Sequence, residues 1–416
     1  MRFMHLADAH LGYRQYNSDD RARDFARAFR QMCQKAITER CQLVLIAGDL
    51  FHGSAMDPRT FLQAVGALEP LREKGIDVIA IAGNHDRART SRGLNWLHAL
   101  QKLGLVTLLE IGIEKGELSL EKAVWERHEI RVIGIPFVGT GLPQILPQIA
   151  DYLALEAMGP TKFTILMLHA GLEGEIPAFR ASLTMENLAP LGPHVDYLAL
   201  GHIHKPYARG DWIFNPGSLE TVSIDEAQWD DRGGILVEIE DGLITGPPTI
   251  EWAIPDRRPF VQISLGVDTF RDPEALYRFY VLTSKDHAML RAEEIGQNPV
   301  VELRLQGSLQ FDRSSLELSR IEQIIEDTYH PLLVRIRDHT ESDASEIAVT
   351  EDATRAEIER HVVRELVGRD AGRKEHAEFW TWMILDLKDM ALARNAPEKI
   401  IAAARSGQRS LTEGLC

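Results

Sequence analysis

The stretch DVIAIAGNHD, residues 77–86, is an aliphatic run that ends abruptly in a polar cluster. Short β-branched and aliphatic runs bounded by turn residues are typical of buried strands. Four other stretches repeat this design, namely RFMHLADAH (2–10), LVLIAGD (43–49), KFTILMLH (162–169) and VDYLALGHIH (195–204). Each is expected to be a strand whose carboxyl end carries polar side chains.

Helical patterns separate the early strands. Residues 25–39 place Phe25, Phe29, Met32 and Ala36 at helical spacing, and residues 58–74 open with a proline in the first turn. This alternation predicts an α/β core. Ligands of such sheets collect beyond the carboxyl ends of the strands, so the five polar clusters are expected to converge on one site.

The polar clusters have the composition of a metal site. Asp8 and His10 are two residues apart, as are His202 and His204, so in extended backbone each pair would project to one face. Asp49 follows a buried strand, and its carboxylate is placed to bridge two adjacent cations; the alternative is that it caps the next helix. Carboxylates, imidazoles and an amide carbonyl without thiolates suit manganese, iron or zinc in a hydrolytic site.

The overall composition limits the possible functions. The 416 residues carry a formal charge of -16, so any DNA contact must be local or metal-assisted. The three cysteines, Cys33, Cys41 and Cys416, lack C-x-x-C spacing, which favours a reducing compartment. No apolar stretch approaches the roughly 18 residues that span a bilayer. We therefore expect a cytoplasmic protein without membrane insertion.

The pattern changes after Pro255. Three alternating strands are expected here, namely FVQISLGV, VVELRLQGSL and HPLLVRIRDHT. A helical stretch at 272–280 lies between the first two, so the pattern predicts a smaller α+β domain. A segment rich in acids and without bases then suits a linker. The expected divisions are 1–255 for the metal-binding domain, 256–340 for the α+β domain, 341–352 for the linker and 353–416 for a helical region.

Five motifs follow one another along the chain, namely D-x-H, GD, GNHD, a lone histidine after a strand, and GHIH. In this order they resemble the motifs of the calcineurin-like metallophosphoesterases. Within that superfamily, HLADAHLGY, LIAGDLFH, IAGNHDR, GHIHKP and NPGSLE are similar to the SbcD-type DNA double-strand-break repair exonucleases. The resemblance implies a calcineurin-like sandwich with a small α+β capping domain and a C-terminal helical segment. It also implies two divalent metal ions per chain, for which we expect manganese.

The resemblance assigns the metal ligands position by position. It places Asp8, His10, Asp49 and His204 on one metal, and it places Asp49, Asn84, His169 and His202 on the other. Asp49 is the shared ligand in this assignment.

Other polar residues near the motifs are candidates for catalysis and DNA binding. His85 is free to protonate the leaving oxygen, and Asp86 beside it would hold the tautomer of the His85 imidazole. The alternative is that His85 only supports the metal ligands. His52 binds phosphate or is a solvated loop residue. Arg87, Arg89 and Arg92 are candidates for contacts with flanking DNA, and the alternative is a solvated face. The resemblance implies that the loop with Tyr13 and Tyr16 also contacts DNA, and the alternative is that these rings pack on their own domain.

The C-terminal region is expected to bind a partner. Thr354 and Glu357 form a capping box, and a later helix carries a broad apolar face that includes Phe379, Trp382, Met383 and Leu387. The resemblance implies an SbcC-type coiled-coil ATPase as the partner, whereas a self-contained helical hairpin is the alternative. A helix at 93–103 would serve a homodimer or belong to the core.

The leading functional prediction is a metal-dependent DNA nuclease, acting as an exonuclease and on single strands as an endonuclease, that works with the ATPase in double-strand-break repair. One alternative is a small-molecule phosphodiesterase, which needs neither a capping domain nor a helical tail. The other is a non-catalytic scaffold, and the intact ligand set with His85 weighs against it.

Overall fold

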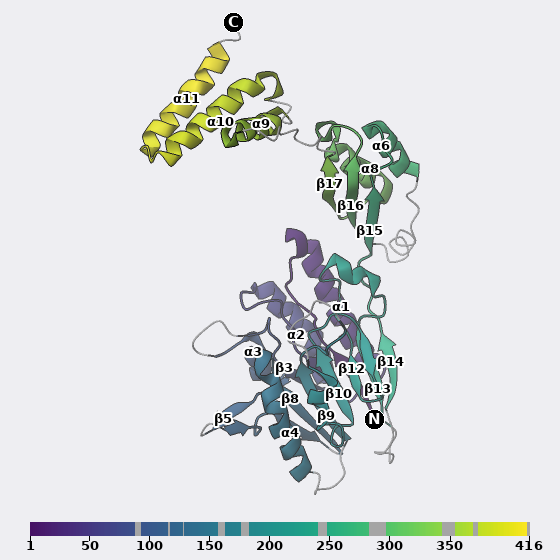
Figure 1. Ribbon diagram of the computed structural model, residues 1–416. Helices are drawn as coiled ribbons and strands as arrows, with labels where there is room; N and C mark the ends of the chain where they lie inside the picture. Colours follow the sequence, from purple (N-terminus) through teal and green to yellow (C-terminus); the bar gives the residue numbers. More distant parts are fainter. Residues whose placement is uncertain are drawn as a thin grey trace. The chain divides into compact units, whose positions relative to one another are not determined.

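The chain forms two compact units, Met1–Phe260 and a second that begins at Val261 (Figure 1). The structure is a computed structural model, and it describes residues 1–87, 93–114, 117–127, 129–156, 163–175, 183–239, 248–282, 297–342, 354–368 and 373–413. None of the helices in these ranges combines the length and apolar character that crossing a bilayer requires.

Six strands form the first sheet of the first unit. Strands β1, β2 and β3 run parallel to one another, whereas β13 joins β1 in the antiparallel direction. In spatial order the strands are β14 (Thr249–Ala253), β13 (Gly234–Glu238), β1 (Arg2–Leu6), β2 (Leu43–Ala47), β3 (Asp77–Ile81) and β4 (Thr107–Leu108).

A second six-stranded sheet completes the first unit. Its strands β8, β9 and β10 are also parallel, so their carboxyl ends share one edge. The spatial order is β11 (Tyr207–Arg209), β12 (Ile213–Asn215), β10 (Tyr197–Gly201), β9 (Phe163–His169), β8 (Ile130–Ile135) and β7 (Val124–Arg127). A separate hairpin contains β5 (Gly112–Glu114) and β6 (Glu117–Ser119).

The two sheets face each other across a continuous apolar core. Phe3, Leu45 and Ile79 of the first sheet pack with Ile165 and Met167 of the second, and all are fully buried. Because strand side chains alternate between faces, the intervening residues of each strand point outward to helices. The expected α/β core is therefore a four-layer sandwich.

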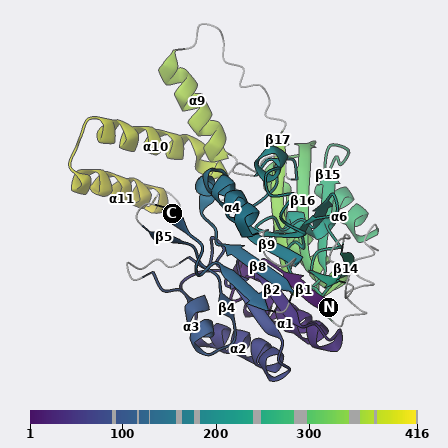
Figure 2. The ribbon, with the colours of Figure 1, turned by 90° about the horizontal axis from the view of Figure 1, so that it is seen from below.

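Helices cover both outer faces of this sandwich. Figure 2 shows α1, α2 and α3 on one side of the strands and α4 on the other. Their bounds are α1 (Asp19–Thr38), α2 (Pro58–Glu73), α3 (Trp96–Lys102), α4 (Leu142–Glu156) and the short α5 (Met185–Leu188).

Capping residues explain where two helices begin. The Ser18 side chain accepts a hydrogen bond from the Arg21 amide, so α1 starts earlier than the expected residue 25. The Asn95 side chain caps α3 in the same way. In α3, Leu97 and Leu100 are buried in the core, so these two leucines do not form a dimer surface.

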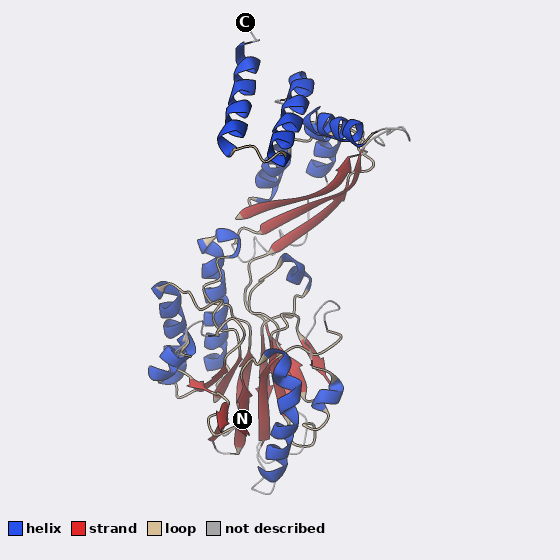
Figure 3. Ribbon diagram, turned by 60° about the vertical axis from the view of Figure 1, so that its left-hand side comes forward, coloured by secondary structure: helices blue, strands red, loops and turns tan. Residues whose placement is uncertain are grey.

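The second unit contains a three-stranded sheet covered by helices. Its elements are β15 (Phe260–Gly266), α6 (Pro273–Leu282), β16 (Val300–Leu309), α8 (Leu318–Tyr329) and β17 (Leu333–Ser342). Figure 3 shows the three strands as long curved ribbons. The sequence interpretation missed α8, which connects the parallel strands β16 and β17 and buries Ile321, Ile325 and Tyr329.

Three further helices lie in the C-terminal part of the second unit. They are α9 (Arg355–Gly368), α10 (Ala377–Leu392) and α11 (Pro397–Glu413). The expected capping box is present, because the Thr354 amide donates to the Glu357 carboxylate and the Glu357 amide donates to the Thr354 hydroxyl. Most of the expected linker, residues 343–352 of 341–352, lies outside the described residues.

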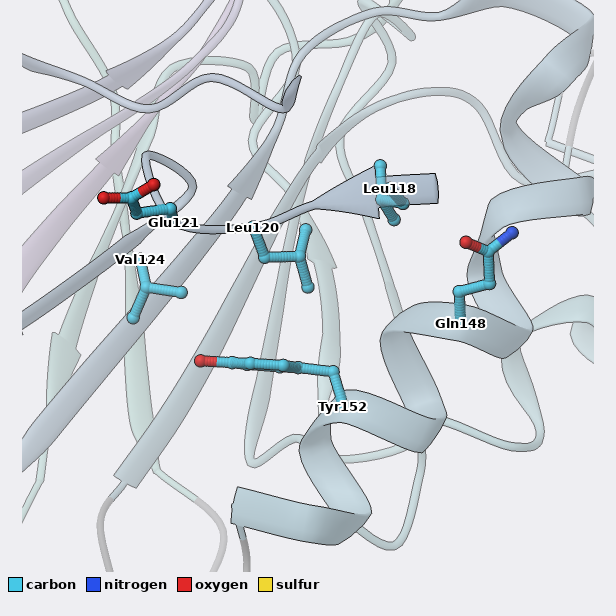
Figure 4. Close-up of a pocket in the computed structure, with 6 residues that line it drawn as sticks. All are labelled: Leu118, Leu120, Glu121, Val124, Gln148 and Tyr152. Atoms are coloured by element: carbon cyan, nitrogen blue, oxygen red, sulfur yellow. The ribbon is translucent and has the colours of Figure 1, made fainter. Parts of the chain in front are cut away.

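A pocket of about 220 Å³ lies between α4 and the strands β6 and β7 (Figure 4). Leu118, Leu120 and Val124 line it from the strands and the turn between them, and Gln148 and Tyr152 line it from α4. None of the candidate site residues lines this pocket.

A buried ion-pair network ties α1 to the last segment of the first unit. Asp24 accepts from Arg21 Nη1 at 2.6 Å, from Arg27 Nη1 at 2.7 Å and from Arg258 Nη2 at 3.0 Å. Arg21, Asp24 and Arg258 are all buried. The network therefore fixes the chain where it leaves the sandwich.

We expect Asp24→Ala to lower the free energy of unfolding of the first unit by about 3–5 kcal/mol, because it leaves buried arginines without their shared partner. Burial alone would raise the pKa of Asp24, but its arginine partners, Arg258 first among them, outweigh burial and lower it. The stabilisation is therefore present at neutral pH and lost in acid. Urea unfolding of Asp24→Ala beside the exposed control Asp211→Ala measures the difference. Equal midpoints for both variants would show that the network contributes nothing.

Candidate metal centre

Five strand ends supply all seven expected metal ligands. Both sheets contribute, and the carboxyl ends of their parallel strands meet at one edge of the sandwich. The ligands are Asp8 and His10 after β1, Asp49 after β2, Asn84 after β3, His169 at the end of β9, and His202 and His204 after β10. The structure thus brings together every residue of the expected set.

Four of these residues adopt a left-handed backbone. The φ angles are 51° at Asp8, 46° at His10, 52° at Asp49 and 86° at His202. This region is uncommon for residues with a side chain and is often found at functional sites. The expectation that extended backbone aligns Asp8 with His10 is therefore wrong, because β1 ends at Leu6 and turning backbone orients both side chains.

Two glycines leave room for the ligands. A Cβ atom at Gly48 would lie 2.2 Å from His169 Nδ1, and one at Gly83 would lie 2.0 Å from Asp49 Oδ1. The missing side chain of Gly48 admits the His169 ring, whose Nδ1–H donates to the Ala47 carbonyl at 2.8 Å.

The ligands gather in two clusters. In the first, His204 Nε2 lies 3.1 Å from His10 Nε2 and 3.8 Å from Asp8 Oδ1. In the second, which also includes His202, His169 Nε2 lies 3.3 Å from Asp49 Oδ2.

Asp49 and Asn84 complete this arrangement. Asp49 Oδ2 is also 4.0 Å from His10 Nε2, so one oxygen of Asp49 is near both clusters. The amide oxygen of Asn84 is 3.1 Å from His169 Nε2, which adds it to the second cluster. One shared carboxylate between two ligand groups is the arrangement expected of a bridged pair of cations.

The chemistry of the donors fits divalent metal ions. The two clusters offer carboxylate oxygens, imidazole nitrogens and one amide oxygen, and both free cysteines described, Cys33 and Cys41, are buried elsewhere in the first unit. A site without thiolates suits manganese, iron or zinc in hydrolysis better than a structural zinc. The backbone amide of His85 donates to Asp49 Oδ1 at 2.8 Å, which leaves Oδ2 to face the clusters.

Burial sets the charge of several candidate ligands. It lowers the pKa of His202 to about 3, so this imidazole is neutral at pH 7 and able to coordinate a metal. Burial also raises the pKa of Asp8 to about 6. It would lower the pKa of His169, but the Asp49 charge outweighs burial and raises the value to about 9. A bound cation would release that proton, because only the deprotonated nitrogen is a ligand.

His85 lies at the edge of the first cluster. Its ring is 4.9 Å from that of His10, centroid to centroid, and its Nδ1–H donates to the His52 carbonyl at 2.7 Å. The carbonyl thereby fixes the tautomer, so the expectation that Asp86 holds this imidazole is wrong. The buried Asp86 carboxylate instead accepts from the backbone amides of Phe51 at 2.9 Å, Gly83 at 3.0 Å and Leu50 at 3.3 Å.

The His52 ring lies between the first ligand cluster and an aromatic side chain. Its Nδ1 lies 3.3 Å from His10 Nδ1, and the ring stacks on Tyr13 with centroids 3.8 Å apart. Tyr13 also contacts Phe25, so it packs on its own domain. Tyr16 lies further along the same loop in a left-handed conformation, with φ 57°.

Arg87 and Phe137 border the second cluster. The Arg87 guanidinium lies over the Phe137 ring at 5.3 Å, and that ring is 5.4 Å from the ring of His202. Arg87 is exposed, so its charge is available beside the site. Arg89 and Arg92 lie outside the described residues. The sequence interpretation did not include Phe137, which belongs to no motif.

Glu226 is a second residue that the sequence interpretation missed. It is buried, and its Oε1 accepts the Nδ1–H of His204 at 2.7 Å. Burial would raise the pKa of Glu226, but the charge of His204 and its hydrogen bond lower it. The NPGSLE motif ends six residues before Glu226, and nothing in its own surroundings in sequence marks it as part of the site.

Comparison with known families defines the class of this fold and site. Residues 1–206 match the calcineurin-like phosphoesterase family, so the chain carries a calcineurin-like phosphoesterase domain. The expected fold class and superfamily are confirmed.

Among individual proteins, the chain is similar to three curated relatives, and each of them is a DNA double-strand break repair protein Mre11. The Archaeoglobus fulgidus protein is 34% identical over 261 residues, covering 59% of this chain and 56% of that protein. The Haloferax volcanii protein is 32% identical and covers 64% and 55%. The Sulfurisphaera tokodaii protein is 24% identical and covers 88% and 96%. For the first two, the match therefore spans just over half of the relative's length.

Proposed function

We propose that this chain is a divalent-metal-dependent nuclease that hydrolyses phosphodiester bonds of DNA in double-strand-break repair. The main support for this proposal is that two ligand clusters share the Asp49 carboxylate within a phosphoesterase domain. The relatives are DNA double-strand break repair proteins, which supports DNA as the substrate. The proposed activity includes exonuclease action and cleavage of single strands.

The proposed mechanism assigns a task to each group. Two divalent cations, with manganese proposed, would supply a nucleophile at neutral pH and offset charge on the phosphate. Asp8, His10, Asp49 and His204 would hold one cation, and Asp49, Asn84, His169 and His202 would hold the other. His85 would protonate the leaving oxygen from Nε2 in its imidazolium form, because its Nδ1–H is held by the His52 carbonyl and only a second ring proton, on Nε2, faces away from that carbonyl.

Contacts to flanking phosphates are proposed for basic residues beside the site. Arg87 is well placed for this, because its guanidinium is exposed and lies over Phe137 next to His202. Phosphate contacts position DNA without reading its sequence, which suits an enzyme that must accept any DNA end. Arg89, Arg92, His52 and Tyr16 belong to the same proposal.

Manganese-dependent cleavage of linear duplex DNA tests the proposed function. Bis-p-nitrophenyl phosphate serves as a generic phosphodiester in a parallel assay. We expect both substrates to be cleaved, with a higher kcat/KM on DNA. Cleavage of the small diester alone would favour a small-molecule phosphodiesterase. Metal binding with cleavage of neither substrate would favour a non-catalytic scaffold.

An SbcC-type ATPase is the proposed partner of the C-terminal helices. On α10, Trp382 is 57% exposed, and Phe379 and Leu387 are half-buried. Met383 is buried, so the proposed contact is carried by the other three side chains. A large exposed aromatic side chain is typical of an interface hot spot. A homodimer also remains part of the proposal.

We expect removal of the residues after Ser342 to abolish ATPase binding and to leave basal hydrolysis unchanged. The cut follows Ser342 rather than Thr340, because β17 continues to Ser342. Among the residues that the structure describes, the core around strands β15, β16 and β17 includes none from α9–α11, so this sheet is expected to keep its packing. A pull-down of the ATPase and a manganese-dependent assay on short single-stranded DNA measure the two effects.

Single substitutions refine this test. Trp382→Ala in the full chain is expected to weaken ATPase binding by about 2 kcal/mol or more, whereas Leu155→Ala, at an exposed leucine of the first unit, is expected to leave it unchanged. Retained binding by the shortened chain would make the helices a folded appendage. Lost hydrolysis would mean that they support the catalytic domain.

A further inference from the structure

A buried carboxylate stands behind one of the proposed metal ligands. Glu226 lies in the short helix Ile224–Gln228, and its Oε1 accepts the Nδ1–H of His204 at 2.7 Å. With the proton on Nδ1, the lone pair of His204 Nε2 points towards His10 and Asp8, 3.1 and 3.8 Å away. The hydrogen bond thus selects which nitrogen faces the first cluster.

The other oxygen of Glu226 is held by three donors. Its Oε2 accepts from the Val222 amide at 2.9 Å, from Arg232 Nη1 at 3.1 Å and from the Ser218 hydroxyl at 3.2 Å. Arg232 is buried and is itself fixed, because its Nη2 donates to the Thr221 hydroxyl at 2.9 Å. The carboxylate therefore cannot turn away from His204 without abandoning several buried donors.

We propose that Glu226 is a positioning residue that holds His204 in its Nδ1–H tautomer and so presents Nε2 to the first metal. This inference rests on the proposed function, because it takes His204 as a ligand. Carboxylates that orient a ligating histidine in this way typically change metal affinity by about 10–100-fold when they are lost. Glu226 is not one of the proposed ligands, and its hydrogen bond to His204 is the route by which it would act.

A glutamine at this position should fail despite its matching size. The Val222 amide and Arg232 can only donate, so the side-chain oxygen of glutamine must take the place of Oε2. Its NH2 group would then face His204 Nδ1 and require that nitrogen to accept. The ring proton would move to Nε2, which could no longer bind a metal.

Manganese titration of the full chain tests the inference, with free Mn²⁺ counted by its electron paramagnetic resonance signal. We expect E226Q to weaken one of two manganese sites by about 10–100-fold and to do so at least as strongly as E226A. The matched control is E302Q, which changes another buried, arginine-paired glutamate in strand β16 of the second unit. E302Q should bind manganese like the unaltered protein.

A double-mutant comparison identifies the route of the effect. In an H204A background, E226Q should cause no further loss of affinity, because the residue through which Glu226 acts is gone. Should E226Q not fold, E226D keeps the charge but withdraws it from His204, and it should weaken the same site. Wild-type affinity in E226Q, or an equal loss with and without His204, would overturn the inference. Failure of the unaltered protein to bind manganese would instead overturn the proposed function.

Discussion

Asp49→Ala should bind neither of the two metal ions and should not hydrolyse DNA above background. Asp49 Oδ2 lies within 4.0 Å of a nitrogen in each ligand cluster, so one substitution removes a ligand from both. Loss of a residue that merely orients a ligand typically lowers metal affinity by about 10–100-fold, so loss of a shared ligand should exceed about 100-fold. Elemental analysis after dialysis against manganese and a nuclease assay on the same sample measure both effects.

The control for this prediction is Asp196→Ala. Asp196 accepts a hydrogen bond from the Thr164 amide at 2.7 Å, at the opposite ends of β9 and β10 from the ligands. This variant loses a carboxylate of the same kind but should retain both metals and full activity. Two metals per chain and normal cleavage in Asp49→Ala would refute the bridging assignment.

His85→Ala should retain both metals and lose about 100-fold or more in the rate of DNA hydrolysis, the usual contribution of a general acid. The reason is geometric, because the His52 carbonyl occupies Nδ1 and leaves Nε2 for the leaving oxygen. His194→Ala, a substitution before the amino end of β10, should change neither property.

The leaving group provides a sharper test of His85. The p-nitrophenolate of bis-p-nitrophenyl phosphate departs without a proton, so His85→Ala should slow its release much less than it slows DNA cleavage. An equal loss on both substrates would argue against proton donation. Loss of a metal from His85→Ala would make this residue a ligand and would require a new assignment of the first cluster.

The sequence predicted the strands and their polar ends because both signals are local. An aliphatic run followed by Gly48 and Asp49, or by Asn84, His85 and Asp86, specifies a buried strand and a tight turn without reference to the rest of the chain. Parallel strands then place their carboxyl ends together, which is why separate motifs converge on one edge.

Other features depend on tertiary contacts and could not be predicted in this way. The adjacency of Asp86 to His85 suggested a pair, but the Asp86 carboxylate turns to backbone amides around residues 50, 51 and 83. Glu226 and Phe137 reach the site from segments that carry no recognised motif. Helix α8 differs from these features, because its buried residues Ile321, Ile325 and Tyr329 are four residues apart and follow a local helical pattern among charged neighbours.

The central claim is that two metal ions share Asp49 at the strand ends of the sandwich. Anomalous scattering from a crystal grown with manganese would test it most directly. We predict two manganese peaks per chain, both contacted by Asp49, with Asp8, His10 and His204 around one and Asn84, His169 and His202 around the other. A single peak, or two peaks of which Asp49 contacts at most one, would contradict the claim.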